Sequence, residues 1–85
     1  MDPARNSEVR KEVLAYLAER QGVSQTSATI HRRVNRENNF TIAEVESALT
    51  FLEGMDLVEH EVDSLGATKY WQATSAGVLH AERNL

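Results

Sequence analysis

Three arginines near the middle of the chain are the residues best suited to bind a charged group. Arg32, Arg33 and Arg36 stand close together at the end of a helix that we expect over residues 26–35. Grouped arginines can neutralise the phosphates of a nucleic acid. Three more basic residues could extend the cluster: Arg5, Arg10 and Lys11. Charge runs are usually solvated surface, however, so the same side chains could instead pair with the neighbouring glutamates. Both interpretations remain open on the sequence.

The other residue types that support chemistry are scattered. The three histidines, His31, His60 and His80, are not joined by any cysteine or by a His-x-x-x-His pair, so we expect no metal site. Serines and threonines stand mainly at predicted caps and turns, where they bond the backbone. The chain has no glycine-rich phosphate loop, and we expect no catalytic residue and no cofactor. The sequence therefore indicates a binding protein and not an enzyme.

Length and composition predict one small globular domain. A chain of 85 residues can build one core, so we expect a single domain over residues 1–85. With 41% hydrophobic and 26% charged residues, it resembles ordinary folded proteins more than disordered ones. No apolar run approaches the roughly 18 residues of a membrane span, and no signal-peptide pattern opens the chain. We therefore expect a cytoplasmic protein with no membrane partner, which the absence of cysteine also suits.

Charge is distributed unevenly along the chain. Residues 37–63 contain eight acidic residues and no lysine or arginine, whereas residues 1–36 carry a net charge of +3. The overall charge of −4 is therefore the sum of unequal parts, of which the central stretch is acidic and the first part is basic. Any nucleic-acid contact from the central stretch has to overcome repulsion between carboxylates and phosphates.

The acidic stretch begins with the best-defined helix of the chain, predicted over residues 42–55. Thr41 and Glu44 have the spacing of a capping box, and Phe40 can form a hydrophobic staple with Val45. Beyond the cap, apolar residues recur every three or four positions, which indicates one buried stripe. That stripe consists of Ile42, Val45, Leu49 and Leu52.

The remaining elements follow from the same signals. Asp2-Pro3 predicts the start of a first helix that ends near Gly22, and the second helix should bury Ala28, Ile30 and Val34. Two strands are expected over residues 57–63 and 68–73, with His60 and Val62 on the apolar face of the first. A last helix, capped by Thr74 or Ser75, should carry the apolar residues Val78 and Leu79, and it could extend to Leu85. The fold class is thus mainly α with a small β-hairpin.

This order of three helices, a hairpin and a last helix resembles the winged helix-turn-helix arrangement, and two segments carry the resemblance. Residues 49–58 resemble the L-x-x-L-x-x-x-G-L-V that ends the recognition helix in bacterial winged-helix regulators, with Asp56 in place of glycine. Residues 70–77 resemble the segment that links the wing to the last helix. The chain looks closest to ArsR-like and PadR-like proteins, and it also resembles the small winged-helix proteins of Mu-like prophages.

The resemblance implies a phage or bacterial transcriptional regulator that binds double-stranded DNA as a homodimer. It implies that helix 42–55 enters the major groove and that hairpin 57–73 acts as the wing. At about 100° per residue, the side of this helix opposite the core presents three small residues to the bases: Ala43, Ser47 and Thr50. The phosphate contacts would be Arg32, Arg33, Arg36 and Lys69.

A second function fits the same fold, because a fold does not fix a function. The acidic helix and Phe51, which the helical geometry places off the core stripe, could bind a basic protein partner without any contact to DNA. The contacts in that case would be Glu44, Glu46 and Phe51.

Overall fold

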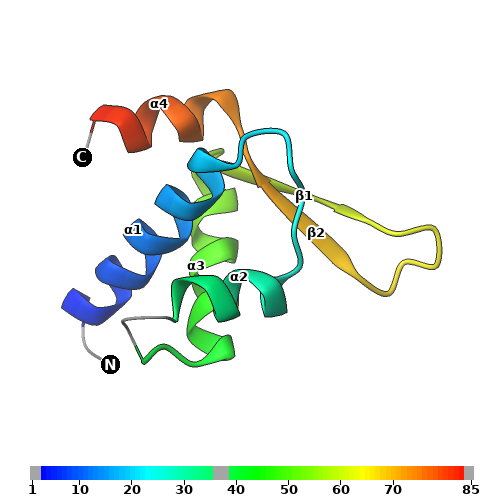
Figure 1. Ribbon diagram of the computed structural model, residues 1–85, viewed down its shortest axis with the longest axis horizontal. Coiled ribbons are helices and arrows are strands. Elements are labelled where there is room, and N and C mark those ends of the chain that lie inside the picture. Colours follow the sequence, from blue (N-terminus) through cyan, green and yellow to red (C-terminus); the bar gives the residue numbers. More distant parts are fainter. Residues whose placement is uncertain (1–2, 36–38, 84–85) are drawn as a thin grey trace.

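A computed structural model describes residues 3–35 and 39–83, and it has the element order expected from the sequence (Figure 1). Three helices form a compact body, from which the hairpin projects to one side, and the last helix crosses one end. No helix in the described part of the chain has the length and hydropathy of a membrane span. The elements are α1 (Pro3–Glu19), α2 (Ser27–Val34), α3 (Ile42–Gly54), β1 (Val58–Val62), β2 (Lys69–Ala73) and α4 (Ser75–Arg83).

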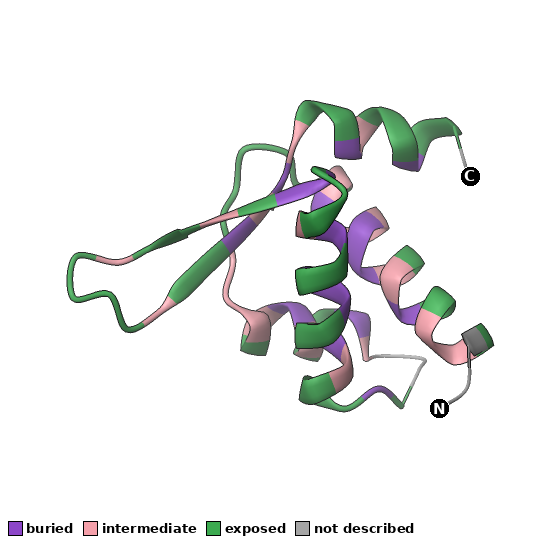
Figure 2. Ribbon diagram, turned by 180° about the vertical axis from the view of Figure 1, so that it is seen from behind, coloured by how far each residue is buried: buried purple, intermediate pink, exposed green. Residues whose placement is uncertain are grey.

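The core lies where the first three helices meet, and Figure 2 shows their buried residues turned toward one another. Each helix contributes apolar residues that recur every three or four positions, as expected for amphipathic helices. The seven largest fully buried side chains are Leu17, Ile30, Leu49, Val9, Val13, Val45 and Val58. Because α3 packs on both α1 and α2, its opposite side is left facing solvent.

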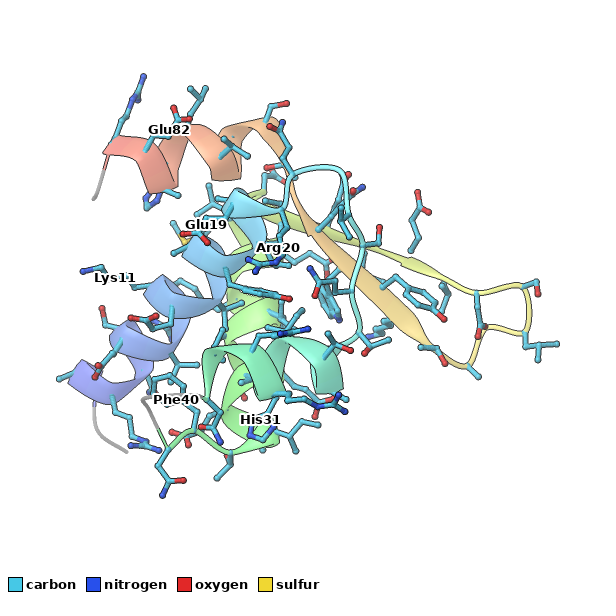
Figure 3. All side chains as sticks on the ribbon, in the orientation of Figure 1. Lys11, Glu19, Arg20, His31, Phe40 and Glu82 are labelled. Atoms are coloured by element: carbon cyan, nitrogen blue, oxygen red, sulfur yellow. The ribbon has the colours of Figure 1, made fainter. Side chains whose placement is uncertain are left out.

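The start of α3 confirms the predicted capping box. The Thr41 side chain accepts a hydrogen bond from the Glu44 backbone N–H at 3.1 Å, and the Glu44 carboxylate accepts from the Thr41 N–H at 2.9 Å. Phe40, just before the cap, is buried, and its carbonyl oxygen lies 2.8 Å from Nε2 of His31 at the same end of the helical body (Figure 3). These contacts fix where α3 begins and how it is oriented against α2.

Three residues expected in the core are exposed instead. Ile42 is 44% exposed because the buried stripe of α3 starts one turn later, at Val45, and Phe40 occupies the core at this end. Ala28 is exposed on the side of α2 that borders a hollow between α3 and the hairpin, and Leu79 is 51% exposed. Leu85 lies outside the described residues. In α4 the small residues Gly77 and Ala81 face the core, so the close approach of this helix leaves Leu79 outside.

The hairpin pairs antiparallel, with His60 opposite Trp71. Only the half of the hairpin near the helices is covered. Val58, Trp71 and Ala73 are buried, whereas Val62, which we expected on the apolar face, is 53% exposed.

One pairing along the other edge of β2 was not predicted from the sequence. Gln25, in the segment expected to be a polar connection, exchanges two backbone hydrogen bonds with Trp71, at 2.9 and 2.7 Å. β2 is therefore held on both edges, which ties the hairpin to the helical body.

Both ends of the hairpin have well-defined turns. Asp56, which stands where the resemblance has glycine, adopts the left-handed conformation with φ of 60°. At the tip, the Asp63 side chain accepts hydrogen bonds from the backbone N–H groups of Ala67, at 3.0 Å, and Leu65, at 3.1 Å. These donors, Ala67 first, lower the pKa of the Asp63 carboxyl group. The turn at the tip is thus held by an ionised carboxylate.

Candidate nucleic-acid interface

The solvent side of α3 carries a line of small polar and apolar residues, as the helical geometry predicted. We call it the α3 ridge, and all its members are exposed: Ala43, Glu46, Ser47 and Thr50. Thr50 donates its hydroxyl proton to the backbone carbonyl of Glu46 at 3.1 Å, so its oxygen remains able to accept. The ridge has one charge, the Glu46 carboxylate. It is narrow, and its other three residues are uncharged, although the surrounding sequence is acidic.

A hollow of about 540 Å³ lies between the α3 ridge and the hairpin. Its walls come from the start of α2, from Glu46 and Thr50 of α3, and from Lys69 of β2. The Ser27 hydroxyl donates to the Glu46 carboxylate at 3.4 Å, and the Lys69 ammonium lies 5.8 Å from the centre of the Trp71 ring. Lys69, one of the predicted phosphate contacts, and the predicted base-facing residue Thr50 thus border the same hollow.

A second hollow lies on the other flank of the α3 ridge, against α1. Glu46 and Thr50 also line this hollow, so they separate it from the first. Its far wall includes Arg10, whose guanidinium lies 3.5 Å from the centre of the Phe51 ring. Phe51 is exposed, as predicted, but its partner in the structure is a basic residue. Sequence reasoning placed Arg10 only in a loose basic cluster, because its contact with Phe51 depends on how α1 crosses α3.

The predicted arginine cluster is only partly described. Arg32 and Arg33 are exposed in the last turn of α2, and Arg36 lies outside the described residues. Ala28 lines the hollow beside the hairpin, and Arg32 stands one turn later on the same side of α2. Arg32 is therefore a second basic residue, after Lys69, on the side of α2 that borders this hollow. Arg33 points about a quarter-turn away.

Glu44 is already paired within the domain. Its carboxylate accepts hydrogen bonds from the Arg5 guanidinium at 2.5 and 3.0 Å, in addition to the capping bond. The Arg5 hydrogen bonds, followed by the bond from Thr41, lower the pKa of Glu44 to about 2. Arg5 also lies 5.4 Å from the centre of the Phe40 ring. Arg5 and Glu44 therefore stabilise the α1–α3 contact, and the sequence did not suggest this pairing.

The histidines lie in separate surroundings. The His60 ring contacts the carboxylate of Glu53 and lies 4.8 Å from the Trp71 ring, while His31 faces the Phe40 carbonyl. Within residues 3–35 and 39–83, no group of three histidine, cysteine or acidic side chains is close enough together to hold a metal ion.

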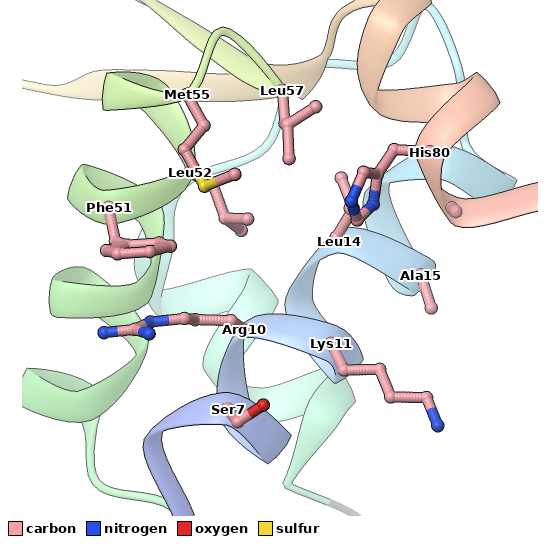
Figure 4. Close-up of a pocket in the computed structure, with 11 residues that line it drawn as sticks. Ser7, Arg10, Lys11, Leu14, Ala15, Phe51, Leu52, Met55, Leu57 and His80 are labelled. Carbon is pink, nitrogen blue, oxygen red and sulfur yellow. The ribbon is translucent and has the colours of Figure 1, made fainter. Parts of the chain in front are cut away.

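A groove of about 380 Å³ lies near the other end of α3, where α1, α3 and α4 meet (Figure 4). Phe51 and Met55 form one side and are exposed, at 43% and 51%. Basic groups stand around it: Arg10, Lys11 and His80. Phe51 thus borders both this groove and the hollow beside the α3 ridge.

Comparison with known proteins identifies the fold. No protein-family model matches the sequence, and no curated protein is similar enough in sequence to match. Among solved structures, a variant of Lactococcus lactis ZitR matches with a TM-score of 0.71 at 22% identity over 89% of this chain. The F-93 protein of SSV1 matches with a TM-score of 0.72 at 24% identity over 88%. S. aureus MepR, in its complex with DNA, matches with a TM-score of 0.73 at 25% identity over 89%.

The matches cover different shares of these proteins. The chain spans 79% of the F-93 chain but only 48% of the ZitR chain and 59% of the MepR chain. In every case the match includes nearly all of the present chain, so it covers the helices and the hairpin together. From its element order, its paired hairpin and these structural matches, we conclude that the chain has the winged helix-turn-helix fold.

Proposed function

We propose that this protein binds double-stranded DNA, with α3 in the major groove and the β1–β2 hairpin as the wing. The observation that carries the proposal is the α3 ridge itself, which is narrow, exposed and flanked by basic residues. A helix about 10–12 Å across with its side chains fits a major groove about 12 Å wide. The similarity to MepR, solved with DNA, supports this placement.

In this proposal the α3 ridge faces the bases, and the basic residues beside it hold the phosphates. Ala43 offers a methyl group to thymine, and the hydroxyls of Ser47 and Thr50 can bond to base edges. Glu46 can accept a hydrogen bond from a cytosine amine, which would offset part of its repulsion of the phosphates. The backbone contacts are Arg32, Arg33 and Lys69, together with Arg36.

The biological role that we propose is transcriptional regulation in a bacterium or phage, in the cytoplasm, by a homodimer that binds a two-fold symmetric site. Dimeric helix-turn-helix proteins place their two recognition helices in successive major grooves, about one helical turn apart. Light scattering of the purified protein measures its mass directly. A mass of one chain at concentrations where DNA is bound would remove the dimer from the proposal.

The phosphate contacts are tested by salt dependence. We expect the double variant Arg32→Ala/Arg33→Ala to bind random-sequence duplex more weakly, with the slope of log K against log salt reduced by about 0.9 for each phosphate that is no longer neutralised. Arg20→Ala, which removes one charge where the double variant removes two, is the control for the loss of an arginine with other partners, because Arg20 lies over the Tyr16 ring and pairs with Glu19 at 3.6 Å. An unchanged slope in the double variant would remove these two arginines from the interface.

The exposed groove beside Phe51 favours a second candidate function, the binding of a protein partner. The residues proposed from the sequence for this role are Glu44, Glu46 and Phe51. The Arg5–Glu44 pair leaves Glu46 as the carboxylate available at the α3 ridge, and Phe51 as the apolar anchor. The basic residues around the groove, Arg10, Lys11 and His80, would repel a basic partner, so its cations would have to meet Glu46 while an apolar part contacts Phe51. Phe51→Ala would then abolish capture of this partner in a folded domain, whereas retained capture would argue against this function.

A further inference from the structure

The proposed DNA contacts leave one flank of the α3 ridge without a phosphate-binding residue. Lys69 and Arg32 both stand on the side toward the hairpin and α2. A helix in the major groove, however, has a sugar–phosphate strand on each side. The stretch of residues 37–63, which includes all of α3, contains no lysine or arginine. A cation on the second flank must therefore come from another element.

Arg10 of α1 is placed there by the structure. It borders the hollow on the α1 side of the α3 ridge, together with Ala43, Ser47 and Phe51. The same hollow is separated from Lys69 by Glu46 and Thr50, which line both sides. Arg10 and Lys69 thus stand on opposite flanks of the ridge.

The contact with Phe51 suits a guanidinium that binds an anion. Arg10 lies over the face of the ring, 3.5 Å from its centre (Figure 4). A guanidinium stacked by its face keeps its N–H groups at the edge, where they can donate two parallel hydrogen bonds to a phosphate. Within residues 3–35 and 39–83, no carboxylate forms an ion pair with Arg10. Its charge is therefore available to a ligand.

We propose that Arg10 contacts the DNA backbone on the flank of α3 opposite Lys69, and that Phe51 is the positioning residue that holds it there. This inference rests on the proposed function and adds a contact from α1. It also gives Phe51 a role in DNA binding that differs from that of an anchor for a protein partner. The second strand of the duplex is then held by α1, while the first is held by α2 and the hairpin.

The test compares variants of Arg10 with a neighbouring lysine. Lys11 is exposed on the next position of α1 and extends away from the Arg10–Phe51 pair (Figure 4), so Lys11→Ala removes the same charge from a different face. Binding of random-sequence duplex is measured by fluorescence anisotropy across a range of salt. We expect Arg10→Ala to reduce the slope of log K against log salt by about 0.9, and Lys11→Ala to leave it unchanged.

Two more variants separate the charge of Arg10 from its position. Arg10→Lys should keep the slope but weaken binding severalfold, because an ammonium lacks the planar donors. Phe51→Leu should weaken binding in the wild-type background and have no further effect beside Arg10→Ala. Thermal unfolding shows that each variant is folded under the binding conditions.

The outcomes distinguish this inference from the proposal on which it rests. If the wild-type protein binds with a salt-dependent affinity and Arg10→Ala has the same slope, Arg10 is not a phosphate contact and the inference is wrong. If Phe51→Leu weakens binding equally with and without Arg10, Phe51 does not act through Arg10. If the wild-type protein does not bind DNA at low salt, the proposed function itself fails.

Discussion

Replacing Gly77 by alanine should destabilise the domain strongly, because α4 lies against the backbone of the turn before β1. A methyl group at Gly77 would lie 1.9 Å from the carbonyl oxygen of Leu57 and 2.9 Å from its carbonyl carbon. Ordinary contact begins at 3.4 Å, so α4 would have to move by about 1.5 Å. The obstacle is backbone, which cannot rotate away as a side chain can.

The size of the effect follows from what this movement breaks. Overpacking costs about 1–3 kcal/mol. Displacing α4 also strains the hydrogen bond from the Thr74 N–H to the Leu57 oxygen, 3.0 Å long, which is worth about 1 kcal/mol. We therefore expect Gly77→Ala to lower the free energy of unfolding by about 3 kcal/mol. For a domain of this size, that corresponds to a fall in Tm of roughly 12–24 °C.

Gly54→Ala is the matched control, since it adds the same methyl group to another helical glycine. No atom lies within 4 Å of the added carbon at Gly54, and alanine favours helix over glycine. We expect this variant to match or exceed the wild-type stability, by up to about 0.5 kcal/mol. Circular dichroism during heating and urea titration measures both variants. A Gly77→Ala protein within about 0.5 kcal/mol of wild type would refute the packing argument.

Two further predictions concern the ends of α3. Hydrogen bonding lowers the pKa of Glu44 from 4.5 to about 2, so this pairing stabilises the fold above pH 4.5 and is lost as pH falls through 2. Glu44→Gln should therefore lower Tm at pH 7, with the difference from wild type shrinking between pH 4.5 and 2; a constant difference would contradict the pairing. Asp56 has φ of 60°, so Asp56→Gly should be about 1 kcal/mol more stable than Asp56→Ala in urea titrations. Equal stability of the two would contradict the strained turn.

Local signals predicted the helices well. The capping box at Thr41 and Glu44 depends on residues three apart, and such short-range bonds form wherever the helix forms. Asp56 stands just beyond the end of α3, where the resemblance has glycine, and it adopts the left-handed conformation that such a position requires. Exposure of the α3 ridge followed from helical geometry and from the apolar stripe opposite it.

Contacts between distant elements could not be predicted from the sequence. Nothing local shows that Gln25 pairs with Trp71, or that Arg10 reaches Phe51, because both depend on the angles at which the elements cross. Arg5 and Glu44 likewise look like two unrelated surface charges in the sequence, although they are 39 positions apart and in contact. The charge map of the sequence therefore overstated the acidity of the α3 surface, since it could not place the basic residues of α1 beside it.

Whether the α3 ridge binds DNA is tested most directly by the binding of the wild-type domain to random-sequence duplex at about 20–50 mM salt and upward. The five proposed contacts, Arg32, Arg33, Arg36, Lys69 and Arg10, would together neutralise about five phosphates, so we expect micromolar affinity with a log–log salt slope of about −4.5, at about 0.9 per contact. No binding at low salt, even with protein at high micromolar concentration, would contradict the proposed function. It would show that the carboxylates of residues 37–63 outweigh the basic flanks.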